Sequence, residues 1–178
     1  ASGSGKSTLL GLLAGLDVLV TNASGIGMKD DESGWAASVS IDLLGTARDW
    51  PQWRGPQRTA ISEETNLLQS WPKEGPKLLW QLTDLGDGYA TPAVAGSRVY
   101  LLSNRRMENE FVQALAADTG KPVWTTRLGN VGNPNQQPSY PMARSTPTVV
   151  GEFLYTFSSD GDIACLQAQS GKVVWTKN

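Results

Sequence analysis

The sequence predicts an all-β fold assembled from repeated antiparallel sheets of about four strands, and two internal repeats support this. Residues 91–103 (TPAVAGSRVYLLS) and residues 146–158 (TPTVVGEFLYTFS) are two copies of one pattern. A second shared pattern follows each copy, VQALAADTGKPVWTT from Val112 and IACLQAQSGKVVWTK from Ile163. Thr-Pro, Gly, Tyr, Leu, Gly-Lys and Trp recur in the same order, which is typical of a repeat protein.

Each repeat predicts two hairpins. In the first copy, Val94 and the apolar run 99–102 lie on either side of a Gly96-Ser97 turn. Residues 111–115 and 122–126 similarly flank Asp118-Thr119-Gly120, where Asp bonds the backbone and Gly accepts a positive φ. Pro92 and Pro147 fall where a strand begins, a place at which a sheet tolerates a missing N–H. One such sheet cannot cover both of its faces, so neighbouring copies are expected to stack.

Tryptophan recurs at one position of the repeat. Trp124 and Trp175 each lie four residues after a turn glycine, Gly120 and Gly171 respectively, and Trp80 in KLLWQL occupies the same position of an earlier, degraded copy. We expect these large rings to make the contacts between neighbouring sheets.

The D-T-G-K-x-V-W ending resembles the quinoprotein-like (PQQ-like) β-propeller repeat. Residues 49–56 (DWPQWRGP) and 67–80 (LLQSWPKEGPKLLW) resemble the mature start of secreted members of that family. The resemblance covers about residues 49–178. It implies a partial propeller of about two four-stranded blades, with repeats near 77–128 and 140–178 after a Trp/Pro-rich lead-in over 49–76. It also implies a bacterial protein in the periplasm or elsewhere outside the cytoplasm. Because a blade takes about 40 residues and a ring four to eight blades, we expect a fragment of a longer protein.

The N-terminal segment 1–17 (ASGSGKSTLLGLLAGLD) ends like a phosphate-binding loop, G-x-x-x-x-G-K-[ST]. In a complete loop Ser7 would also hold Mg²⁺. The leucines that follow predict a short helix with Leu9, Leu12, Leu13 and Leu16 on one face. The candidate nucleotide-phosphate ligands are Gly3, Ser4, Gly5, Lys6, Ser7 and Thr8.

Segment 1–17 resembles the start of an ABC-transporter ATPase subunit. The family's Leu-Ser-Gly-Gly-Gln signature and switch histidine are absent from the sequence. ATP and Mg²⁺ are therefore expected only if the loop is completed. An alternative interpretation treats Lys6 and the apolar run LLGLLAGL as a secretory signal, although Asp17 interrupts it and the run is too short to span a membrane. Residues 18–48 match neither family and are predicted to form a poorly ordered junction.

Composition excludes several function classes. The net charge is −2 with no basic stripe, which argues against nucleic-acid binding. No Lys/Arg-rich amphipathic helix or integral membrane segment is predicted. The sequence has no histidine, so His-based catalysis and His metal ligands are excluded within it. The single Cys165 is expected to be a small buried residue.

Three hypotheses for function remain. The favoured one is a non-enzymatic protein-interaction scaffold, comparable to the assembly propeller of bacterial outer membranes, that binds a protein partner or self-associates through exposed blade edges. The second is a quinone-dependent dehydrogenase. The resemblance would then require a Cys-Cys pair and Ca²⁺ ligands that the sequence lacks, so no quinone cofactor (PQQ) is expected. The third is ATP hydrolysis through Lys6 and Ser7. Further candidate binding residues are Tyr140 and Arg144 in the long connection 129–145, which is alternatively a solvated link between blades. Arg54 and Arg58 are interpreted as an anion site, as surface residues or as packing partners of the tryptophans.

Overall fold

The computed structural model of the protein divides into two compact units. One unit contains 1–48 and 62–85, and the other contains 49–61 and 86–178. The predicted phosphate ligands and most of the predicted junction lie outside the described residues. The structure describes strands β1 and β2 by backbone, and residues 49–63, 70, 73, 78–83, 85–133 and 142–178 in full.

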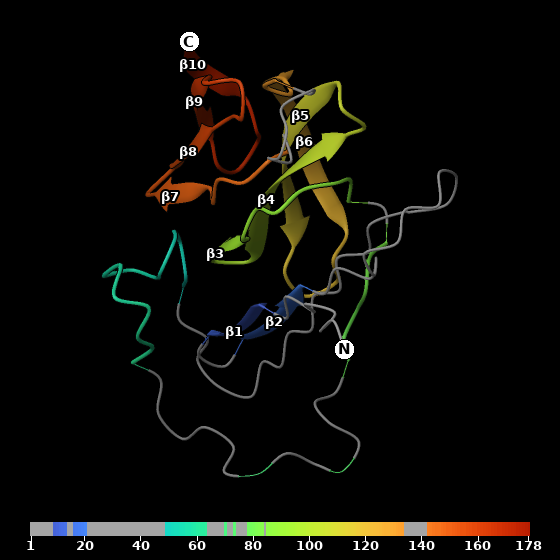
Figure 1. The fold of residues 1–178 in the computed structure, drawn as a ribbon. Coiled ribbons are helices and arrows are strands. Elements are labelled where there is room, and N and C mark those ends of the chain that lie inside the picture. The colour runs from blue at the N-terminus through green and yellow to red at the C-terminus, as the bar shows by residue number, and fades with distance from the viewer. Residues whose placement is uncertain are drawn as a thin grey trace, which may run out of the picture. The chain divides into compact units, whose positions relative to one another are not determined.

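The larger unit contains two sheets of four antiparallel strands (Figure 1). The first has the order β3-β4-β5-β6, so each strand pairs with the next one along the chain. Its strands are β3 (Ala93–Ala95), β4 (Arg98–Arg105), β5 (Asn109–Ala116) and β6 (Pro122–Asn130). The predicted turn residues Gly96 and Gly120 have φ of 56° and 68°, a conformation that glycine adopts without steric cost. Both hairpins predicted for this repeat are therefore confirmed.

The second sheet repeats this plan, and its last three strands are shorter than those of the first. Its order along the sheet is β10-β9-β8-β7, again with sequential antiparallel neighbours. Its strands are β7 (Thr148–Val150), β8 (Phe153–Phe157), β9 (Ile163–Gln167) and β10 (Val173–Lys177). As predicted, Pro92 and Pro147 come directly before β3 and β7. The two sheets confirm the expected partial propeller.

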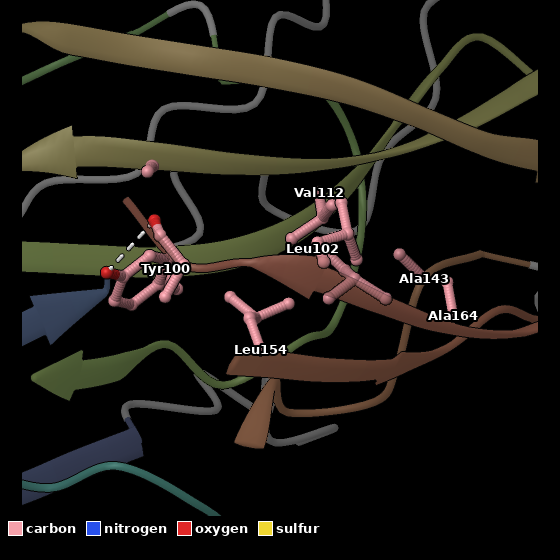
Figure 2. Packing of buried hydrophobic residues seen from close by; sticks show 9 residues of the cluster. Tyr100, Leu102, Val112, Ala143, Leu154 and Ala164 are labelled. Carbon is pink, nitrogen blue, oxygen red and sulfur yellow. Dashed lines mark hydrogen bonds between the residues drawn. The ribbon is translucent and has the colours of Figure 1, made fainter. Parts of the chain in front are cut away.

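The core lies between the two sheets (Figure 2). Tyr100 and Leu102 of β4 face Leu154 of β8, and all three are at most 3% exposed. The cluster also contains small residues, which let the sheets approach closely. Its members are Tyr100, Leu102, Val112, Ala114, Ala143, Leu154, Ala164, Leu166 and Ala168.

Residues 49–61 connect the first strands of the two sheets. Trp50 pairs through its backbone with Val94 of β3, and the Val149 N–H of β7 donates to the Pro51 carbonyl at 2.8 Å. The Asp49 carboxylate accepts from the Gly96 N–H at 2.8 Å, which fixes the start of this segment on the β3–β4 turn. The segment therefore continues both sheets at their shortest strands.

The other unit contains a two-stranded antiparallel hairpin of β1 (Leu9–Leu13) and β2 (Leu16–Val20). This corrects the predicted Leu-rich helix. A short leucine run does not distinguish a helix from a strand by periodicity, and Gly11 disfavours a helix whereas Val18 and Val20 favour a strand. No helix among the described residues is long and apolar enough to cross a membrane.

Candidate interaction surfaces

The contact between the two sheets is centred on Trp124. Its indole Nε1 donates to the Ala168 carbonyl at 3.0 Å, and the Tyr100 hydroxyl donates to the same oxygen at 3.3 Å. The Thr126 hydroxyl donates to the Gly171 carbonyl at 2.7 Å. A Cβ on Gly171 would collide with the Trp124 ring, so the turn must carry glycine there. The repeat residues Trp124 and Gly171 are therefore in direct contact. The 167–171 turn of the second sheet packs against the Tyr100–Trp124 pair of the first.

The second sheet carries the same aromatic pair on its outer face. Tyr155 and Trp175 have ring centroids 6.3 Å apart at 52°, compared with 6.0 Å and 47° for Tyr100 and Trp124. Trp175 is 45% exposed, and Phe157, two residues beyond Tyr155 on the same face of the sheet, is 51% exposed. On the first sheet, the corresponding aromatic pair packs against the 167–171 turn, and the indole donates a hydrogen bond to that turn. The outer face of the second sheet has the same aromatic pair and the same indole donor.

Trp80, the third repeat tryptophan, belongs to the smaller unit and is buried at 9% exposure. Gly120, the counterpart of Gly171, is buried with a positive φ.

The 52–61 loop is the most exposed part of the segment that joins the sheets. Trp53 and Ile61 are 56% and 67% exposed. The Trp50 ring, by contrast, packs against the loop backbone, because a Cβ on Gly55 would lie only 2.8 Å from it. The Arg58 Nε donates to Gln52 Oε1 at 3.0 Å, within the same loop.

The loop is nevertheless highly constrained. Arg54, Arg58 and Ala60 all have positive φ, near 60°, which costs about 1–3 kcal/mol for each non-glycine residue. Backbone bonds hold this conformation, including Ala60 N–H to the Arg54 carbonyl at 2.9 Å and Arg58 N–H to the Gly55 carbonyl at 3.1 Å. An ordered, strained loop that displays tryptophan and arginine has the features of a protein-binding surface, because these residues dominate binding energy at interfaces.

Polar contacts also join the sheets at the far end of the core. The Glu110 carboxylate accepts from the Ser159 N–H at 2.9 Å and from its hydroxyl at 2.6 Å. Burial raises the pKa of Glu110, the bonds from Ser159 lower it in part, and the charges of Asp162 and Asp160 raise it further. Sequence reasoning missed this residue. Its only signal is an acidic side chain in the mainly apolar strand β5.

The remaining candidates are placed as follows. Arg144 lies over the Tyr89 ring at 5.7 Å, and Tyr140 lies outside the described residues. Cys165 is buried, as expected. Among the described residues, no group of three or more acidic, histidine or cysteine side chains is arranged to hold a metal ion. The six predicted phosphate ligands, Gly3 to Thr8, lie outside the described residues.

Comparison with known proteins shows a family match over most of the chain. The family described as "Outer membrane protein assembly factor BamB" matches residues 27–178. An outer membrane protein assembly factor BamB of Moranella endobia is 27% identical over 90 residues, which are 51% of this chain and 22% of that protein. A tetrathionate hydrolase of Acidithiobacillus ferrooxidans is 26% identical over 110 residues, 62% of this chain and 19% of that protein. The crystal structure of BamB from Moraxella catarrhalis superposes with a TM-score of 0.43 at 20% identity, over 56% of this chain and 26% of that one.

The chain therefore spans about a fifth of the length of the curated relatives it matches. The match begins at residue 27, so it gives no support to the transporter-ATPase resemblance of residues 1–17.

Proposed function

The chain belongs to the family of the outer membrane protein assembly factor BamB, a family of PQQ-like propeller repeats, and from this premise we propose that it is part of a non-enzymatic scaffold that binds protein partners outside the cytoplasm. The matched range covers both sheets and the 52–61 loop. The scaffold role uses neither a quinone nor a nucleotide cofactor. It requires only a rigid propeller with a surface to which another protein can bind.

The observation that carries the proposal is the 52–61 loop. It follows directly on Trp50 and Pro51, whose backbone bonds to β3 and β7 fix the point at which the loop begins. The loop exposes Trp53 and Ile61. Three of its other residues adopt a positive φ, which is unfavourable for residues other than glycine. A loop ordered at such a cost, with no apolar cover for its tryptophan, is preorganised for binding. Preorganisation raises affinity because less conformational entropy is lost when the partner binds.

The test uses the whole protein in its own bacterium, with a photo-reactive amino acid in place of Trp53. The matched control places the same group at Glu152, which is exposed in the β7–β8 turn of the second sheet. We expect a discrete crosslinked protein from position 53 and none from position 152. The same adducts from both positions, or none from position 53, would contradict a role for this loop.

A second experiment tests the assembly role that the family name suggests. Trp53→Ala in the whole protein is expected to lower the amount of assembled outer-membrane proteins while leaving the level of the protein itself unchanged. Equal assembly in Trp53→Ala and unaltered cells would remove the loop from that role.

The tetrathionate hydrolase match supports one alternative, in which the whole protein is an enzyme that acts on tetrathionate. Incubation of the purified whole protein with tetrathionate distinguishes the two functions. The scaffold proposal expects no turnover above that of a heat-denatured sample. Turnover that is kept in Trp53→Ala would favour the enzyme.

A further inference from the structure

Three buried polar atoms have no hydrogen-bond partner in the described part of the chain. They are Asn104 Nδ2, Glu110 Oε1 and Thr156 Oγ1, from residues that are 0%, 0% and 5% exposed. Buried polar groups in native proteins are nearly always paired, by protein or by ordered water. Three unpaired atoms in one small protein therefore call for a common explanation.

The three residues lie on the facing surfaces of the two sheets. Asn104 and Glu110 are directly opposite each other in the β4–β5 register, two residues beyond the Leu102–Val112 pair of the core. Thr156 of β8 lies two residues beyond Leu154, on the same face of the second sheet, and pairs with the core residue Ala164. Because side chains alternate along a strand, all three point into the space between the sheets.

The three residues also lie at the same end of that space. The bonds from Ser159 to Glu110 show that the chain just beyond Thr156 meets the sheet at Glu110. Gly132 packs so closely against the Ser159 carbonyl that a Cβ would collide there, which closes this end of the interface. The polar layer therefore continues the apolar core rather than forming an open cleft.

Existing bonds fix what each free atom can do. The Ala143 N–H donates to Asn104 Oδ1 at 2.6 Å, so the amide oxygen is oriented and Nδ2 is left as a donor. Both bonds from Ser159 go to Glu110 Oε2, so Oε1 is left as an acceptor. The Thr156 hydroxyl can donate or accept. The layer thus offers a donor, an acceptor and one group that is both.

We propose that this layer, formed by Asn104, Glu110 and Thr156 between the two sheets, is a binding site for ordered water. A water molecule accepts from the amide, donates to the carboxylate and exchanges a bond with the hydroxyl, which satisfies all three atoms. Buried waters typically make about three such bonds. A metal ion fits less well because the amide Nδ2 presents protons to it. Asp160 and Asp162 are the charged groups that act on Glu110 from the facing loop.

Thr156→Val tests the proposal through the direction in which the urea midpoint of unfolding changes. The substitution keeps the side-chain volume and removes the hydroxyl. If the site is hydrated, the water loses a partner and the urea midpoint of unfolding falls by roughly 0.5 M. If the site is dry, an unsatisfied buried hydroxyl is removed and the midpoint rises. The matched control is Thr176→Val, because Thr176 pairs with the same Ala164 from β10 but is exposed.

The experiment measures urea unfolding of the full chain for both variants, and a high-resolution crystal structure of the unaltered protein. A lower midpoint for Thr156→Val than for Thr176→Val, with density bonded to the three atoms, would support the proposal. A higher or equal midpoint would overturn it, as would a site without density. Titration with CaCl₂ tests the ligand class. A rise in midpoint with Ca²⁺ that Glu110→Gln abolishes would overturn water in favour of a cation.

Discussion

The two sheets have matching sequences but different surroundings. Tyr100 and Leu102 of the first sheet are 3% and 2% exposed, whereas their counterparts in the second sheet, Tyr155 and Phe157, are 37% and 51% exposed. The aromatic pairs that these tyrosines form with Trp124 and Trp175 have nearly the same geometry in both sheets. The repeat sequence therefore sets the shape of this face locally.

Burial of the face depends on its neighbour. In the first sheet, the turn 167–171 and the strands β8 and β9 of the second sheet lie against it. The second sheet presents the corresponding face with its aromatic side chains exposed. Each repeat therefore supplies one half of a contact between sheets. Whether a given residue is buried depends on the neighbouring sheet as well as on its position in the repeat.

Alanine at the matched positions Leu102 and Phe157 gives the largest expected difference. Leu102→Ala leaves a cavity between the sheets and should lower the free energy of unfolding by about 2–5 kcal/mol. Phe157→Ala removes an exposed ring and should change it by about 0.5 kcal/mol or less. Urea unfolding followed by circular dichroism measures both. Equal losses would mean that another sheet or a second copy covers Phe157 in solution, and sedimentation would distinguish these two cases.

Alanine at two turn glycines should give the next largest difference. Gly171 and Gly151 have φ of 70° and 58°, so both substitutions introduce backbone strain of about 1–2 kcal/mol. Only Gly171→Ala also forces a Cβ into Trp124, whereas a Cβ on Gly151 meets nothing within 4 Å. We expect Gly171→Ala to cost about 1–3 kcal/mol more than Gly151→Ala, because overpacking adds to the strain.

Trp124 fluorescence should also respond to Gly171→Ala and remain unchanged in Gly151→Ala. Equal decreases in melting temperature for the two variants would show that the packing of the turn against Trp124 contributes little to the stability of the protein.

The sequence predicted the hairpins because their determinants are local. Turn glycines such as Gly96 and Gly120 fix where a strand reverses, and the repeat shows the same pattern twice. The 9–20 region was predicted incorrectly because leucine fits a helix and a strand almost equally in a short run. There the pairing of two backbones, rather than the side-chain pattern, determines the structure.

Glu110 and the 52–61 loop could not be predicted for a different reason. An acidic residue in a strand ordinarily indicates a solvated position, and Glu110 becomes buried only when a loop 49 residues further along the chain reaches it. Likewise, the positive φ of Arg54 and Arg58 follows from bonds within the folded loop, since neither residue type favours that conformation. Such features depend on tertiary contacts that one sequence does not reveal.

The smallest expected effect concerns the pH dependence of the polar contact between the sheets. Burial raises the pKa of Glu110 above its ordinary value of 4.5, so the folded state holds this proton more tightly than the unfolded state. Its contribution to stability is therefore fully present below pH 4.5 and is lost as the pH rises through the raised pKa.

Glu110→Gln should remove this decline in stability with rising pH. Burial also raises the pKa of Asp87, so the unaltered protein will keep a second contribution, and the relevant quantity is the difference between variants. Glu152→Gln, at an exposed position of the second sheet, should follow the unaltered curve. Thermal unfolding from acid to neutral pH measures all three proteins. Parallel curves for Glu110→Gln and the unaltered protein would show that the Glu110 carboxyl titrates like one on the surface, and that its protonation does not affect the contact between the two sheets.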